Sequence, residues 1–92
     1  MSVALGQIVV SRAGRDTGKK FVVVRVLDLL FVEISDGDLR RMEKPKKKKI
    51  KHLEITCEKV ESLEEKLKSN SKITNAEIRK ALAGLNTQQN DK

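Results

Sequence analysis

The sequence has no tryptophan or tyrosine, and its two phenylalanines, Phe21 and Phe31, are its only residues of the Phe, Trp and Tyr group. Both lie in apolar runs typical of strands, so we expect both rings in the core. Proteins that read single-stranded RNA by sequence usually stack its bases on exposed aromatic side chains. The scarcity of such residues therefore disfavours a sequence-specific reader of single strands.

Metal and redox chemistry have little support, because Cys57 is the only cysteine and His52 the only histidine. One cysteine cannot form an intramolecular disulfide, and this pair cannot assemble the usual zinc ligand sets. We interpret Cys57 as a small residue at the start of a helix. With 92 residues there is little room for an enclosed catalytic cavity, so we expect a binding protein that is not an enzyme and has no cofactor.

Long apolar runs and a basic leader are also missing from the sequence, which predicts a cytoplasmic protein without a membrane anchor. The positive charge, in contrast, is concentrated. The chain carries a formal net charge of +7, and residues 37–53 hold eight Lys and Arg against two acids. Such a concentration usually marks contact with a polyanion. A membrane surface is the less favoured polyanion, because the lysine run has no interleaved Trp, Phe or Leu and lies between predicted strands rather than on an amphipathic helix.

The segment AGRDTGKKF, residues 13–21, has glycines before a lysine, as phosphate-binding loops do. Its spacing does not fit, because three residues rather than four separate Gly14 from Gly18. A phosphate loop also opens a helix, whereas a β-branched strand pattern follows here. We therefore predict that residues 13–19, the glycine loop, form a turn that needs a positive φ at Gly14 or Gly18. Asp16 is expected to brace this turn through backbone amides.

The first half of the chain alternates with a period of two, which predicts short strands. Val22, Val24 and Val26 should lie on one face of the strongest strand, and Phe21, Val23 and Arg25 on the other. Asp36-Gly37 is a strong turn signal. The strands are expected at residues 7–12, 20–27, 30–35, 39–43 and 52–56, with Pro45 interrupting the ladder. Five short strands favour a small closed barrel, because closure removes exposed edges.

The second half changes to a helical period. Val60, Leu63 and Leu67 predict a helix over residues 57–68. A second helix has a capping box of Thr74 and Glu77, a staple of Ile73 and Ile78, and an expected end at Gly84. We therefore predict a barrel over residues 1–56 that folds without the helices, a two-helix segment over 57–85 and a disordered tail over 86–92.

The segment LGQIVVSRAGRDTGKKFVVVRV resembles the KOW motif of ribosomal proteins and transcription elongation factors, through Gly6, Val9, Gly14, Asp16, Gly18 and Val22 to Val26. The stretch DGDLRRMEKPKKKKIKHL is similar to the large-subunit ribosomal protein family L-fourteen-e of eukaryotes and archaea, through Asp36, Gly37, Arg40, Arg41, Pro45 and the basic run. The resemblance covers about residues 5–56. It implies an SH3-like barrel and, as in much of this set of proteins, binding to ribosomal RNA, whereas some members bind proteins instead.

The basic side chains of this region are the candidate RNA contacts, and with few aromatic residues they should grip phosphates and read shape rather than sequence. They are Arg12, Arg15, Lys19, Lys20, Arg40, Arg41, Lys44, Lys46, Lys47, Lys48, Lys49, Lys51 and His52. A plainer interpretation of residues 46–49 is a solubilising loop. The alternative function is a protein-interaction module in transcription or translation control. Its partner groove would be formed by Val60, Leu63, Leu67, Ile78 and Leu82.

Overall fold

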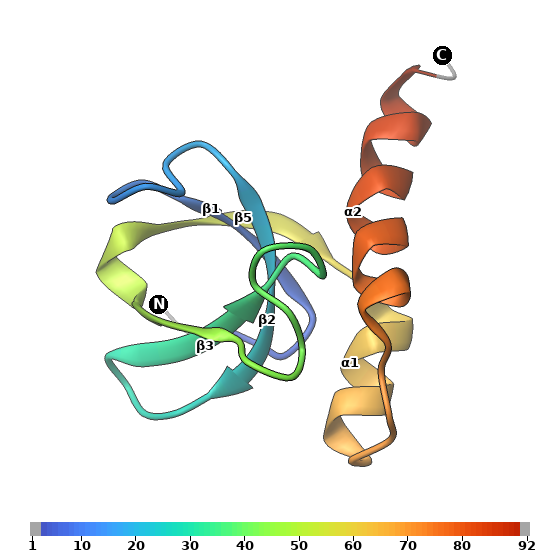
Figure 1. The fold of residues 1–92 in the computed structure, drawn as a ribbon, viewed down its shortest axis with the longest axis horizontal. Helices are drawn as coiled ribbons and strands as arrows, with labels where there is room; N and C mark the ends of the chain where they lie inside the picture. Colours follow the sequence, from blue (N-terminus) through green and yellow to red (C-terminus); the bar gives the residue numbers. More distant parts are fainter. Residues whose placement is uncertain (1–2, 91–92) are drawn as a thin grey trace.

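The computed structural model describes residues 3–90, with side chains over residues 3–83, and contains one five-stranded antiparallel sheet and two α-helices (Figure 1). The sheet has the order β4-β3-β2-β1-β5, so β4 and β5 are its edges. The elements are β1 (Gln7–Ser11), β2 (Lys20–Val26), β3 (Phe31–Ser35), β4 (Lys46–Lys49), the 3-10 turn η1 (Ile50–His52), β5 (Leu53–Lys59), α1 (Glu61–Lys68) and α2 (Asn75–Asn90).

The alternation of β2 divides its side chains between two cores, as the sequence predicts. One of them, the inner core, consists of Val9, Phe21, Val23, Val32, Ile34 and Leu53. The sheet is curved (Figure 1) but not closed, so the predicted closed barrel is not observed. The predicted alternation fails after Val24, because a register shift between Val23 and Arg25 places Val26 opposite Val32. A bulge of this kind sends the following side chains to the opposite faces.

The second core, the helix-facing core, joins the sheet to the helices, which stand beside it in Figure 1. It consists of Ile8, Val22, Val24, Leu63, Ile73 and Ile78, all buried. The apolar face of the helices is therefore packed on the sheet. The two halves of the chain thus share a core, and β5 continues past the predicted boundary at residue 56 to Lys59. Independent folding of residues 1–56 stays a prediction.

The long β3–β4 loop, residues 36–45, is held against the start of α2. The backbone N–H of Met42 donates to Asn75 Oδ1 at 2.7 Å, and Arg79 Nη1 donates to the Gly37 carbonyl at 2.6 Å. Gly37 has a φ of +75°, and a Cβ at this position would overlap the Asn75 carbonyl. Glycine is thus required both for the turn and for the close approach of the helix.

The predicted strand over residues 39–43 is wrong, because this segment is hydrogen-bonded within the loop and to α2 rather than to a neighbouring strand. Asp36 Oδ1 accepts from the backbone N–H groups of Asp38 and Arg40, both at 2.9 Å, and Ser35 Oγ donates to the Arg40 carbonyl at 2.6 Å. The expected aspartate-glycine turn is confirmed. The strand comes later, as the lysine run itself, and Pro45 precedes β4 rather than interrupting it.

Two predictions about the helical region are also wrong. Cys57 lies in β5 rather than at a helix start, because pairing with β1 continues as far as the Gln7–Lys59 pair. The second helix runs past Gly84 to Asn90, since a glycine inside a helix lowers its stability but need not end it. Residues 86–90, which we expected in a disordered tail, have helical backbone, and residues 91–92 lie outside the described residues.

The start of α2 confirms the capping box. The backbone N–H of Glu77 donates to Thr74 Oγ1 and that of Thr74 donates to Glu77 Oε2, both at 3.2 Å. Ile73 and Ile78 are both buried in the helix-facing core, as a hydrophobic staple requires. Over the described residues, neither helix combines the length and the apolar character needed to cross a membrane.

Replacing Ile78 tests whether helices and sheet fold as one unit. Ile78 is fully buried, so Ile78→Ala should lower the free energy of unfolding by about 2 to 5 kcal/mol. Urea unfolding followed by circular dichroism at 222 nm measures this change. Leu39→Ala, at an exposed position, is the matched control and should change stability by less than about 0.5 kcal/mol. Equal effects of the two variants would show that the helix-facing core does not stabilise the protein.

The capping box predicts a pH dependence. The hydrogen bond from Lys66 Nζ, at 2.6 Å, and that from the Thr74 backbone hold the pKa of Glu77 below its usual 4.5. A carboxylate with a lowered pKa stabilises the folded state above its unfolded pKa, and this contribution is lost as pH falls below about 4.5. Glu77→Gln should therefore be less stable than the wild type at pH 7, with a difference that shrinks toward pH 3. Urea unfolding at several pH values measures it, and a constant difference would contradict it.

Candidate functional site

The four lysines of β4 alternate between the two faces of the sheet edge. Lys46 and Lys48 pair with Ile34 and Val32, whose side chains belong to the inner core. Lys47 and Lys49 pair with Glu33 and Phe31 on the outer face. Lys46 and Lys48 are half-buried, whereas Lys47 and Lys49 are exposed. Lysine suits an edge strand, because its stem covers apolar neighbours while its charge stays in water and discourages pairing with other chains.

The ring of Phe31 contacts the two outer-face lysines, Lys47 and Lys49. The Nζ of Lys47 lies 4.5 Å from the ring centroid and that of Lys49 lies 6.0 Å from it, as in cation–π contacts. Phe31 is half-buried, so the prediction that both phenylalanines belong to the core is right for Phe21 only. The sequence does not predict this position of the Phe31 ring, because its place on the outer face follows from the pairing of β3 with β4.

On the inner side, Lys48 connects β4 to the glycine loop. Its Nζ donates to the Ala13 carbonyl at 2.8 Å. The loop itself is closed by Thr17, whose backbone N–H and Oγ1 both donate to the Gly14 carbonyl, at 3.3 and 2.6 Å. Gly14 and Gly18 have φ values of +81° and +88°, which confirms the predicted turn requirement.

Asp16 plays a different part from the one expected. Its side chain is 7% exposed, and Oδ2 accepts from Arg40 Nη2 at 2.9 Å and from Arg40 Nε at 3.1 Å. Asp16 thus fixes an arginine of the β3–β4 loop instead of bracing its own loop through backbone amides. The sequence places these residues 24 positions apart, and no local pattern connects them.

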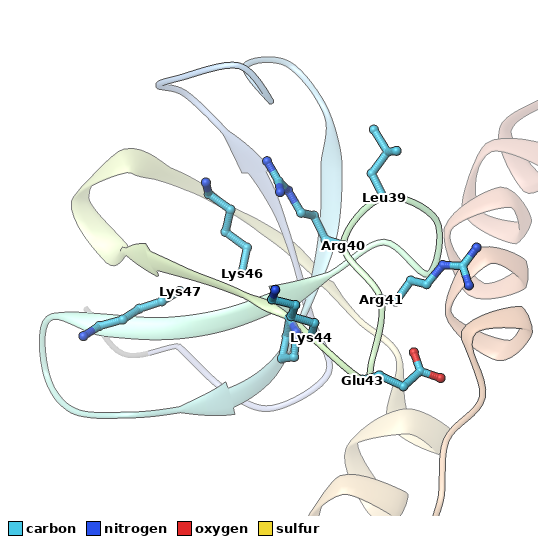
Figure 2. A pocket seen from close by; sticks show the side chains of 8 residues that line it. Leu39, Arg40, Arg41, Glu43, Lys44, Lys46 and Lys47 are labelled. Atoms are coloured by element: carbon cyan, nitrogen blue, oxygen red, sulfur yellow. The ribbon is translucent and has the colours of Figure 1, made fainter.

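A shallow groove of about 560 Å³ lies where the β3–β4 loop leads into β4. In Figure 2, the side chains of Arg40 and Lys46 extend in the same direction, whereas Lys47 points away and Arg41 extends toward α2. Arg41 Nε donates to the Asp38 carbonyl at 3.0 Å. The groove is lined by Leu39, Arg40, Arg41, Glu43, Lys44, Pro45, Lys46 and Lys47.

The structure therefore brings together only part of the predicted basic set. Arg40, Lys44, Lys46 and Lys47 line the groove, and Lys48 and Lys49 continue along β4. Arg15 and Lys19 are exposed on the glycine loop, which Lys48 and Arg40 contact. Lys20 begins β2 and is half-buried, and Lys51 and His52 follow β4 in η1. Arg12 lies on the β1–β5 side, where it faces Glu54 at 4.0 Å.

The charge of β4 is not compensated within the fold. Over residues 3–83, no carboxylate oxygen lies within 4 Å of Nζ of Lys46, Lys47, Lys48 or Lys49, whereas several lysines of β5 and the helices are paired with glutamates. Their polar or ring contacts are the Ala13 carbonyl and Phe31. The lysine strand is thus a concentrated positive surface open to an anionic ligand.

The helical groove expected for a protein partner is filled. Leu63 and Ile78 are buried, and Val60, Leu67 and Leu82 pack against the same core.

The chain matches no protein-family model. Among the described residues, no group of three or more His, Cys, Asp or Glu side chains is arranged to hold a metal ion.

Removing Arg40 tests the link between the two loops. Arg40→Gln leaves the buried Asp16 carboxylate without its cation, so the free energy of unfolding should fall by about 1 to 3 kcal/mol. Arg41→Gln removes the same charge from an exposed neighbour and should cost less than about 0.5 kcal/mol. Urea unfolding of both variants at pH 7 provides the comparison. If Arg41→Gln is as destabilising as Arg40→Gln, the Asp16–Arg40 pair does not hold the loops together.

Proposed function

We propose that this chain is a non-catalytic RNA-binding protein of the KOW type that grips the phosphates of structured RNA, with ribosomal RNA as its expected target in the cytoplasm. The observation that carries the proposal is the uncompensated lysine strand β4, connected through Lys48 to the glycine loop. Phosphate contacts of this kind supply most of the affinity of nucleic-acid-binding proteins and need no enclosed pocket.

The proposed fold is an SH3-like barrel, as the KOW resemblance implies. Support comes from five short antiparallel strands, an inner core, a strongly curved sheet (Figure 1) and a glycine loop between β1 and β2. In this arrangement β4 is an edge strand that pairs only with β3 among the described strands. Its lysines follow one another along this edge on alternating sides, so a ligand whose charge is arranged in a line can contact them as it follows the edge.

Structured RNA suits this surface better than an unfolded strand. Phe21 is fully buried and the ring of Phe31 lies beneath Lys47, so neither phenylalanine forms an open stacking platform. A-form helices are recognised mainly by shape, through phosphates and 2′-hydroxyls. The groove beside Arg40 and Lys46 is shallow and cationic, which fits a phosphate backbone.

Replacing all four β4 lysines with glutamine tests the proposal. Fluorescence anisotropy with several unrelated RNA hairpins, at graded salt, should give a linear fall of log affinity against log salt. Loss of up to four phosphate contacts should flatten this slope by up to about 3 units. Circular dichroism checks that the variant is folded.

The control replaces Lys59, Lys68, Lys72 and Lys80 with glutamine, which removes the same charge from exposed positions of β5, the helices and their connection. Its slope should stay close to that of the wild type. If both variants flatten the slope equally, only net charge matters and β4 is not the contact surface. No binding of the wild type to any hairpin at low salt would refute the proposed function itself.

A further inference from the structure

The β2–β3 hairpin tip presents large apolar side chains to solvent. Leu29 is 93% exposed and Leu30 is 67% exposed. Leu27 and Val26, which precede them, are also exposed. Single exposed leucines are common on protein surfaces, but a contiguous cluster of this kind usually marks a contact site.

The tip is held in a defined conformation. Asp28 Oδ1 accepts from the backbone N–H groups of Leu30 and Phe31, each at 2.8 Å. The N–H of Leu27 donates to the Phe31 carbonyl at 3.0 Å, and that of Ile50 donates to the Leu30 carbonyl at 2.8 Å. The two leucines are therefore presented without the entropic cost of ordering a loose loop on binding.

A notch of about 370 Å³ lies at this tip, lined by Leu29, Leu30, Lys49, Ile50 and Lys51. Its floor is aliphatic and its charged side chains are both lysines. Asp28, the nearest acid in the sequence, does not line the notch, and one of its oxygens is used in the turn. The notch thus combines an apolar surface with positive charge.

The notch is continuous with the lysine strand. Lys49 belongs to both, and Phe31, which lies beneath Lys47 and Lys49, directly follows Leu30 in the chain. A ligand whose phosphates follow β4 therefore reaches the apolar notch at the Lys49 end of the strand.

We propose that this notch receives an unpaired nucleobase of the RNA whose backbone the β4 lysines hold. This inference rests on the proposed function and narrows its substrate class to duplex RNA interrupted by a bulged or looped nucleotide. Leu29, Leu30 and Ile50 provide apolar surface for the faces of the base, while Lys49 and Lys51 meet the flanking phosphates. Apolar side chains, leucine included, are known to pack against unstacked bases.

An acidic protein segment is the competing occupant, and the size of the notch disfavours it. Specific protein interfaces bury about 800 Å² on each partner. Five lining residues, two of them lysines with charged ends, cannot supply such an area. One planar ring with a phosphate on either side needs much less surface.

The test compares two RNA hairpins that differ only in a single bulged nucleotide. The wild type should bind the bulged hairpin about 5- to 50-fold more tightly, which corresponds to burial of about 40 to 90 Å² of apolar surface by the base. The double variant Leu29→Ser, Leu30→Ser should lose this preference but keep its affinity for the paired hairpin and its salt slope. Leu5→Ser, which removes a half-buried leucine outside both the notch and the basic groove, should keep the preference. A 2-aminopurine at the bulge should change its fluorescence with the wild type and not with the double variant.

The outcomes separate this inference from the proposed function. Equal affinity of the wild type for both hairpins would overturn the inference while leaving phosphate binding in place. A double variant that weakens both complexes equally would also overturn it, since the leucines would then be general contacts. Methyl NMR shifts of Leu29 and Leu30 that appear with an acidic, leucine-containing peptide but not with the bulged RNA would assign the notch to a protein partner instead. If neither RNA binds, the proposed function itself fails.

Discussion

The ion pair between Asp16 and Arg40 is the interaction on which the candidate site most depends. A carboxylate buried at the glycine loop accepts two hydrogen bonds from a guanidinium of the β3–β4 loop. On its other side, the same loop is fixed to α2 through Asn75 and Arg79. The long connection is therefore held at both flanks, and β4 starts from a defined position. Without these contacts the loop would gain conformational freedom, and the groove beside Arg40 would not keep one shape.

The lysine strand reconciles two demands that usually conflict. An edge strand exposes unpaired backbone groups that invite association with other chains, and charged residues are a common protection against this. A binding surface, in contrast, has to attract its ligand. Four lysines suit both demands, because they repel the lysines of another copy of the chain and, in the proposed function, attract a polyanion. Their stems lie over Val32, Ile34 and Phe31, so they remain compatible with strand pairing despite the low β-propensity of lysine.

Features set by local sequence were predictable, and features set by distant contacts were not. The strands around β1, β2 and β3, the Asp36-Gly37 turn, the positive φ of the glycine loop and the Thr74–Glu77 capping box all follow from residues close in the chain. The strand at Lys46–Lys49 was missed because lysine-rich segments form strands only where a partner such as β3 covers their stems. The roles of Asp16 and Phe31 depend on Arg40 and on Lys47, which only the folded chain brings near. The prediction that the second helix ends at Gly84 is wrong, because a glycine by itself is a weak signal for the end of a helix.

The position of β4 explains how one short strand can serve two kinds of contact. At its Lys46 end it adjoins the groove that contains Arg40, and at its Lys49 end it adjoins the notch of Leu29 and Leu30. A strand of four residues spans only about 10 Å between its first and last Cα atoms, so a single ligand can reach both ends. Cationic contacts alone distinguish nucleic acids poorly, since every duplex offers phosphates. In the proposed complex, an apolar notch at a fixed distance from the basic groove adds a requirement that regular duplexes do not meet. The proposal therefore accounts for selectivity toward RNA shape in a chain with almost no aromatic residues.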